Sequence, residues 1–140
     1  MIILDTNVIS ELMRPEPDPT VLAWSFGLRK DETFTTAVSE GEVRYGVARL
    51  PAGVRRTELQ HAADRIFRDL LRDRILPFDS KAARRFAGIL AERRRAGHAT
   101  AIPDAQIAAI AATHDATLAT RNTRDFQDCG ARVINPWETT

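Results

Sequence analysis

Short apolar runs recur along the chain, and longer stretches with helical spacing separate them. The run Ile2-Ile3-Leu4 has no polar position, which is typical of a strand buried on both faces of a parallel sheet. Four later segments have the β-branched and apolar composition of strands. They are Thr33–Thr36, Ile75–Phe78, Thr117–Thr120 and Arg132–Ile134.

Helical spacing fills most of the chain between these strands. Val8, Ile9 and Leu12 predict a helix that ends before Pro15, and the proline-rich segment 14–19 predicts a loop. Other helices are expected over Pro19–Phe26, around Val43, Val47 and Leu50, over Thr57–Arg72, from Asp79 or Ser80 to Ala96, and from Pro103 onward. The stretch Arg121–Gln127 is expected to be a loop or a short helix.

Strands that alternate with helices indicate right-handed βαβ units. We therefore expect an α/β fold in which a mainly parallel five-stranded sheet is flanked by helices. The chain has no internal repeat and no linker long enough to divide it, so residues 1–140 are expected to form a single domain.

The composition is that of an ordinary soluble globular protein, with 44% hydrophobic and 28% charged residues. The single cysteine, Cys129, cannot form an internal disulfide, which fits a reducing compartment. The apolar opening run is too short for a signal-peptide core or a membrane span. We therefore expect a cytoplasmic protein that does not associate with a membrane.

The net charge of +1 conceals an uneven distribution. Residues 49–95 hold 13 basic and 6 acidic residues, a balance of +7, whereas the rest of the chain holds 7 and 13, a balance of −6. Nearly all the positive charge is arginine, whose planar guanidinium suits phosphate, so the pattern fits a protein that handles a polyanion. Solvated helix faces give the same pattern, and the run Arg93-Arg94-Arg95 is open to both interpretations.

Asp5 directly follows the first strand, at the edge where open α/β sheets place their ligand crevice. Two interpretations of this carboxylate are open. It is either the first ligand of a metal site or the N-cap of the following helix.

Two later carboxylates have the same ambiguity. Glu42 either points from its helix toward the end of the first strand, or forms a capping box with Ser39 three residues earlier. Asp104 follows Pro103 in the first turn of a helix, where the helix dipole alone favours a negative charge.

Asn122 and Asp125 follow the fourth strand and offer an amide and a carboxylate oxygen at a strand's carboxyl end. Both residue types are also common in loops. One site explains all these residues together, since Mg²⁺ binds several oxygen ligands and retains some waters. Two such ions can activate a water and stabilise the leaving oxygen of a phosphodiester.

Four segments together resemble the PIN-domain family, and most closely its VapC-type toxins of the FitB-like branch. They are Leu4–Ser10, Glu42–Val47, Pro103-Asp104 and Thr120–Phe126. The stretch Ile75–Asp79 and the closing Asn135-Pro136-Trp137 also look like that branch, and the resemblance covers essentially the whole chain.

The resemblance implies a three-layer PIN-like fold and a Mg²⁺- or Mn²⁺-dependent ribonuclease. The family's acidic metal ligands carry over to Asp5, Glu42 and Asp104. The fourth position is divided between Asn122, where FitB-like proteins have an acid, and Asp125. Thr6 and Thr120 look like the hydroxyl-bearing positions that support the carboxylates.

The resemblance also implies the partners. They are an RNA substrate, a VapB- or FitA-like antitoxin, promoter DNA reached through that antitoxin, and a second copy in a homodimer. An alternative function follows from Asn122, which brings no charge to the site. In that alternative the nuclease is attenuated, and the chain acts mainly as a co-repressor in an antitoxin–DNA complex.

Overall fold

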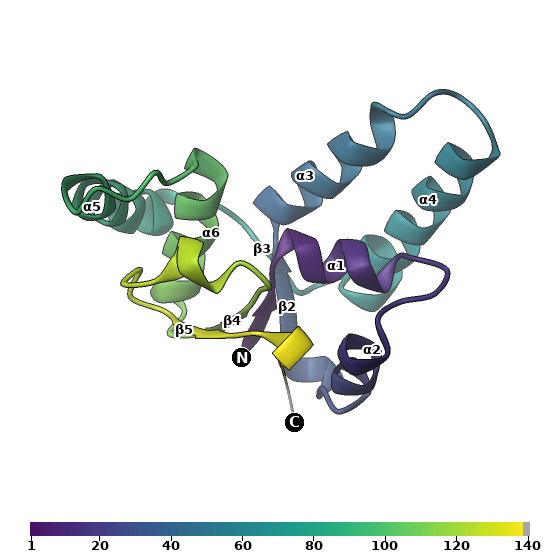
Figure 1. Ribbon diagram of the computed structural model, residues 1–140, viewed down its shortest axis with the longest axis horizontal. Helices are drawn as coiled ribbons and strands as arrows, with labels where there is room; N and C mark the ends of the chain where they lie inside the picture. Colours follow the sequence, from purple (N-terminus) through teal and green to yellow (C-terminus); the bar gives the residue numbers. More distant parts are fainter. Residues whose placement is uncertain (139–140) are drawn as a thin grey trace.

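Five short strands form a parallel sheet in the order β3-β2-β1-β4-β5 in the computed structural model, which describes residues 1–138 (Figure 1). The last two residues of the expected domain therefore lie outside the described residues. The strands are β1 (Ile2–Leu4), β2 (Thr33–Thr36), β3 (Ile75–Leu76), β4 (Thr117–Ala119) and β5 (Arg132–Ile134). The predicted parallel five-stranded sheet is confirmed.

The first strand of the chain occupies the centre of the sheet. Ile2 pairs with Thr33 of β2 on one side and with Thr117 of β4 on the other, both in parallel register. The chain builds outward from β1 through β2 to β3, and then returns to the other side for β4 and β5. The boundary between β1 and β4 is therefore a topological switch point, where open α/β sheets form a crevice at the carboxyl ends of the strands.

Within the described residues, six α-helices surround the sheet. They are α1 (Thr6–Leu12), α2 (Pro19–Phe26), α3 (Ala37–Ala48), α4 (Val54–Asp64), α5 (Ser80–Arg95) and α6 (Ile102–Thr113). Helices α5 and α6 lie on one side of the sheet, and α1, α3 and α4 lie on the other (Figure 1). The short helical turns are η1 (Lys30–Glu32), η2 (Arg65–Leu70), η3 (Thr123–Phe126) and η4 (Pro136–Glu138).

Each strand sends alternate side chains into two separate hydrophobic cores. Ile3 and Leu118 are fully buried in the core beneath α5 and α6. Their neighbours Leu4 and Ala119 are buried in the core beneath α1 and α3. This alternation is why β1 has no polar position and why Leu118 and Ala119 of β4 are both apolar, and it produces the expected three layers.

Two predicted elements differ from the structure. The helix expected over Thr57–Arg72 begins earlier, at Val54, and changes at Arg65 into the π-helical turn η2. The strand expected over Ile75–Phe78 ends at Leu76, because β3 pairs with only the last two residues of β2 at the edge of the sheet. Within residues 1–138, no helix combines the length and the apolar character needed to span a membrane.

Candidate active site

An open cleft of about 550 Å³ lies at the carboxyl ends of β1 and β4, at the switch point of the sheet. Residues from the start of α1, from α3, from α6, from the loop after β4 and from η4 line it. They are Asp5, Thr6, Asn7, Ser10, Glu11, Arg14, Glu42, Asp104, Arg121, Asn122 and Trp137. Four of the five predicted catalytic positions are in this set, and Asp125 is not.

Asp5 is 4% exposed and has hydrogen bonds to both carboxylate oxygens. The Thr6 backbone N–H donates to Oδ1 over 2.8 Å, so Asp5 is the N-cap of α1. The Thr120 hydroxyl donates to Oδ2 over 2.7 Å. Asp5 therefore caps the helix, as one interpretation predicted, and also lines the cleft, as the other required.

The pKa of the Asp5 carboxyl is raised, mainly because the side chain is buried. The hydrogen bonds from Thr120 and Thr6 oppose that rise by stabilising the charged form. The negative charges of Glu42 and Asp125 raise the pKa further. Asp5 thus lies close to other negative charges, and a cation bound beside it would reduce their repulsion.

The Thr120 hydroxyl joins the ends of β1 and β4. Besides donating to Asp5, its oxygen accepts hydrogen bonds from the Asn7 side-chain amide over 3.3 Å and from the Asn122 backbone N–H over 3.1 Å. The Asn7 Oδ1 in turn accepts from the Arg121 backbone N–H over 3.2 Å. Thr120 is fully buried, so these bonds fix the strand ends that form the cleft.

Glu42 reaches the cleft from the second turn of α3. The Thr6 hydroxyl donates to Glu42 Oε1 over 2.7 Å, which ties α3 to the start of α1. Of the two interpretations left open for Glu42, the capping box with Ser39 is excluded, because α3 begins at Ala37 and Thr36 is its N-cap, with the Thr36 hydroxyl accepting from the Ser39 N–H. Glu42 therefore has no capping role and faces the cleft instead.

Asp104 lies in the first turn of α6 and is partly buried. Its pKa is raised to about 6, first by burial and then by the negative charges of Asp5, Asp125 and Glu42. The positive charge of Arg93 opposes the rise. The three carboxylates come from three separate elements, and the charges of Asp5 and Glu42 raise the pKa of Asp104 because all three face the same space.

The structure separates the two candidates for the fourth position. Asn122 lines the cleft and is exposed there. Asp125 is exposed in η3 outside the lining, although its charge raises the pKa of both Asp5 and Asp104. The uncharged Asn122 side chain therefore borders the cleft, whereas Asp125 lies outside the lining and affects the cleft carboxylates through its negative charge.

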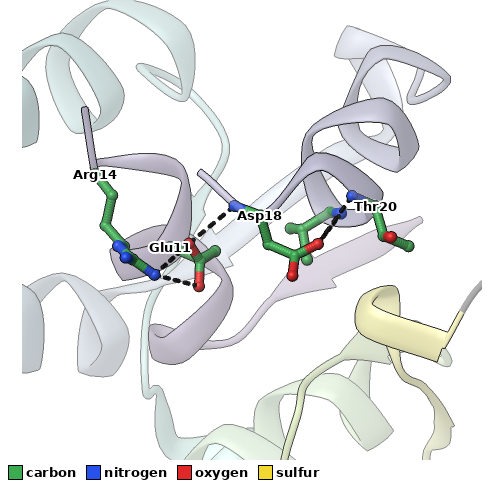
Figure 2. Close-up of polar contacts among 5 residues, drawn as sticks. Glu11, Arg14, Asp18 and Thr20 are labelled. Atoms are coloured by element: carbon green, nitrogen blue, oxygen red, sulfur yellow. Dashed lines mark hydrogen bonds and ion pairs between the residues drawn. The ribbon is translucent and has the colours of Figure 1, made fainter. Parts of the chain in front are cut away.

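Glu11 is a cleft residue that the sequence did not single out. It is 8% exposed, and its carboxylate accepts from Arg14 Nη1 over 3.1 Å and from the Asp18 backbone N–H over 3.1 Å. Asp18 caps α2 through the N–H groups of Thr20 and Val21, so Glu11 connects the end of α1 to the start of α2 (Figure 2). The i,i+3 spacing of Glu11 and Arg14 was the available signal.

The Arg93-Arg94-Arg95 run is not one cationic surface. Arg93 is 4% exposed, and its guanidinium donates to the Thr100 hydroxyl over 2.8 Å and to the backbone oxygens of Arg124 and Gln127. Its contact with phosphate is therefore excluded, and it holds η3 against the end of α5. Arg94 and Arg95 are exposed.

The cleft suits a hard divalent cation in its donor chemistry. Carboxylate oxygens of Asp5, Glu42 and Asp104, with nearby hydroxyl and amide oxygens, are the ligand types that Mg²⁺ and Mn²⁺ take. Among residues 1–138, no three Asp, Glu, His or Cys side chains lie close enough to form a ready-made coordination group. Mg²⁺ is commonly held by one or two carboxylates together with several waters, which this cleft can supply without a closed cage of protein ligands.

Comparisons with known proteins give a consistent result. The family profile described as PIN domain matches residues 2–131. The chain is 42% identical over 138 residues to VapC ribonuclease Y4jK of Sinorhizobium fredii, covering 99% of each chain. It is 39% identical to Toxin FitB of Neisseria gonorrhoeae, covering 98% of this chain and 99% of that one. A solved structure of FitAB bound to an IR36 DNA fragment superposes with a TM-score of 0.92 at 38% identity, covering 100% of this chain and 98% of that one.

Proposed function

The chain belongs to the PIN-domain family, and from that membership we propose that it is a divalent-metal-dependent endoribonuclease and the toxin of a toxin–antitoxin pair. Relatives named VapC ribonuclease and Toxin FitB, each about as long as this chain, support the assignment. The observation that carries it is the convergence of Asp5, Glu42 and Asp104, from three elements, on one cleft at the switch point.

In this proposal Asp5, Glu42 and Asp104 hold Mg²⁺ or Mn²⁺, and the substrate is an RNA phosphodiester. When bound, such an ion supplies a water of lowered pKa and neutralises charge on the phosphate. The hydroxyls of Thr120 and Thr6 orient Asp5 and Glu42 through the bonds described above. The chain therefore presents oriented carboxylates, and no side-chain nucleophile is needed.

The test uses purified protein, free of any partner, incubated with bulk tRNA or mRNA and Mg²⁺ or Mn²⁺. Wild type is expected to cleave, chelation is expected to stop cleavage, and Asp5→Asn is expected to lower the rate by about 100-fold or more. Asn keeps the shape of Asp and can still cap α1, so loss of fold is not the expected cause. Equal cleavage by both proteins, or none by either, would show that the mechanism is wrong.

We also propose an antitoxin as the partner, seated in the groove between α1, α3 and α4. This groove has a volume of about 1300 Å³ and shares Ser10, Arg14 and Glu42 with the cleft. A chain bound in it would therefore reach the carboxylates and block the RNA. Co-expression with the product of the neighbouring upstream reading frame is expected to give a complex without nuclease activity, whereas independent purification of the two proteins would contradict the pairing.

The second candidate function is an attenuated nuclease that acts mainly as a co-repressor. It is favoured by Asn122, an uncharged residue lining the cleft, and by the DNA-bound FitAB relative. Asn122→Asp distinguishes the two candidates. A large gain in cleavage supports the attenuated site, while no change favours Asp125 as the working fourth residue.

A further inference from the structure

An acidic cleft repels RNA unless positive charge on the protein offsets the repulsion. Two arginines, Arg14 and Arg121, line the cleft. Arg14 is paired with the buried Glu11 over 3.1 Å. Arg121 has no carboxylate within ion-pair distance among residues 1–138. Arg121 is therefore the lining cation whose charge is available to a ligand.

The Arg121 guanidinium is held in place although the residue is exposed. Its carbon lies 5.0 Å from the centre of the Trp137 ring, a cation–π contact. Its backbone N–H donates to Asn7 Oδ1, which fixes the start of the side chain to the end of β1. Trp137 is itself anchored, because its backbone N–H donates to Asn135 Oδ1 over 2.9 Å and its side chain packs against the core beneath α1.

We propose that Arg121 binds a backbone phosphate of the RNA next to the scissile one, and that Trp137 is a positioning residue that orients the guanidinium for it. This inference rests on the proposed nuclease function. A guanidinium stacked on an aromatic ring keeps its N–H edges free for the paired bonds that suit phosphate oxygens. Asn7 and Trp137 already restrict the Arg121 side chain in the free protein, so less conformational entropy is lost when RNA binds.

The test measures binding of a fluorescently labelled single-stranded RNA to the full chain by anisotropy, across a range of salt concentrations. Ca²⁺ replaces Mg²⁺, and gels check that the probe stays intact. Arg121→Gln is expected to weaken binding about tenfold. It is also expected to reduce the slope of log affinity against log salt by about 0.7, the contribution of one phosphate contact on a single strand.

The matched control is Arg132→Gln, which removes the same charge from an exposed residue. Arg132 lies at the amino end of β5, whereas the cleft lies at the carboxyl ends of β1 and β4. It is expected to change neither affinity nor slope appreciably. Arg121→Lys is expected to keep the slope and lose affinity, since lysine retains the charge without the planar fork. Trp137→Leu is also expected to keep the slope and lose affinity, because the Arg121 charge remains but its guanidinium is no longer oriented. If Trp137 had only a structural role, the folded variant would bind RNA with unchanged affinity.

The outcomes separate this inference from the proposed function. If wild type cleaves RNA but Arg121→Gln matches Arg132→Gln in affinity and slope, the inference is overturned and the nuclease stands. If wild type binds RNA with the expected dependence on Arg121 but never cleaves, the phosphate site stands and the nuclease fails. If RNA does not bind and Arg121→Gln instead weakens only a protein partner, Arg121 belongs to a protein interface and the inference is overturned.

Discussion

Thr120 donates its hydroxyl hydrogen to Asp5 Oδ2 over 2.7 Å, although 115 positions of sequence separate the two residues. The bond joins the carboxyl ends of β1 and β4, and it orients the most buried carboxylate of the cleft. Both the stability of the fold and the geometry of the candidate site therefore depend on one hydroxyl group.

Thr120→Val is expected to reduce the free energy of unfolding by about 2–3 kcal/mol. It leaves the buried Asp5 carboxylate without its hydroxyl donor, and it removes the acceptor of the part-buried bonds from the Asn7 amide and the Asn122 N–H. Thr120→Ser keeps the hydroxyl and is expected to cost about 1 kcal/mol or less. Urea denaturation of the two variants measures the difference. If the valine variant is as stable as the serine variant, the hydroxyl does not have this role.

The acidic cleft is expected to make stability depend on pH when divalent ions are absent. The pKa of Asp104 is about 6 in the folded protein, against 3.8 for an ordinary aspartate. Between these values the folded state binds more protons than the unfolded state, so the free energy of unfolding falls as pH rises from about 4 to about 6. The buried Asp5, whose pKa is also raised, contributes in the same direction.

Asp104→Asn tests this dependence because it removes the titrating group. The gain in stability of this variant over wild type is expected to be larger at about pH 7, where Asp104 is charged, than at about pH 4. Chemical denaturation in the presence of a chelator measures both values. A gain that is equal at the two pH values would contradict the raised pKa.

Divalent cations are expected to stabilise the protein through the same carboxylates. At a Mn²⁺ concentration about 100 times the dissociation constant, binding adds about 2.7 kcal/mol to the free energy of unfolding, which a rise in Tm reports. Asp104→Asn is expected to lose most of that rise. Asp31→Asn, which removes an exposed carboxylate in η1, is expected to retain it. Equal rises in the two variants would show that Mn²⁺ acts elsewhere, and NaCl at matched ionic strength controls for screening.

Arg93 and Arg94 are neighbours of the same type with opposite expected effects. Arg93→Met is expected to destabilise the fold by about 2–4 kcal/mol, since it removes buried hydrogen bonds to Thr100 and to the backbone of η3. Arg94→Met, at an exposed position, is expected to stay within about 0.5 kcal/mol of wild type. Comparable losses in both variants, measured by urea denaturation, would contradict the assignment of Arg93 as a structural residue.

Much of the fold could be predicted because strand composition and helix spacing are local. Ile3 and Leu4 are apolar since they enter two different cores, and that pattern is visible without knowing either core. The parallel sheet followed from the general rules for βαβ units, whereas the order of its strands was not predicted. The placement of Asp5 at a central strand end needed nothing beyond the first five residues.

The features that the local sequence left undecided depend on contacts distant in sequence. Thr36 and Ser39 are both good N-caps. The helix begins at Ala37, directly after the pairing of β2 with β3 ends at Thr36 and three residues before a Ser39 cap would start it. The burial of Arg93 depends on the backbone of η3, 31 and 34 positions away. No local pattern distinguishes Arg93 from the exposed Arg94.

The candidate site, too, could not be identified from the local sequence alone. The sequence placed carboxylates at strand ends and helix starts, where capping explained each of them equally well. Only the tertiary structure shows that Asp5, Glu42 and Asp104 face one cleft, and that Arg121 and Trp137 lie at its edge. Asn122 and Asp125 remain competing candidates for the fourth position, since one lines the cleft and the other contributes the charge.

Because β1 pairs with both β2 and β4, this central strand acquires its two neighbouring strands at different times during synthesis. Thr33 follows Ile2 closely along the chain, whereas the other neighbour of Ile2, Thr117, is synthesised much later. Hydrogen exchange at the Asp5 amide, which donates to the Ala119 backbone oxygen, would report when that second pairing forms. A nascent chain ending before Thr117 carries all three cleft carboxylates but lacks β4 and the lining residues Arg121, Asn122 and Trp137, so the site cannot form until that segment has been synthesised.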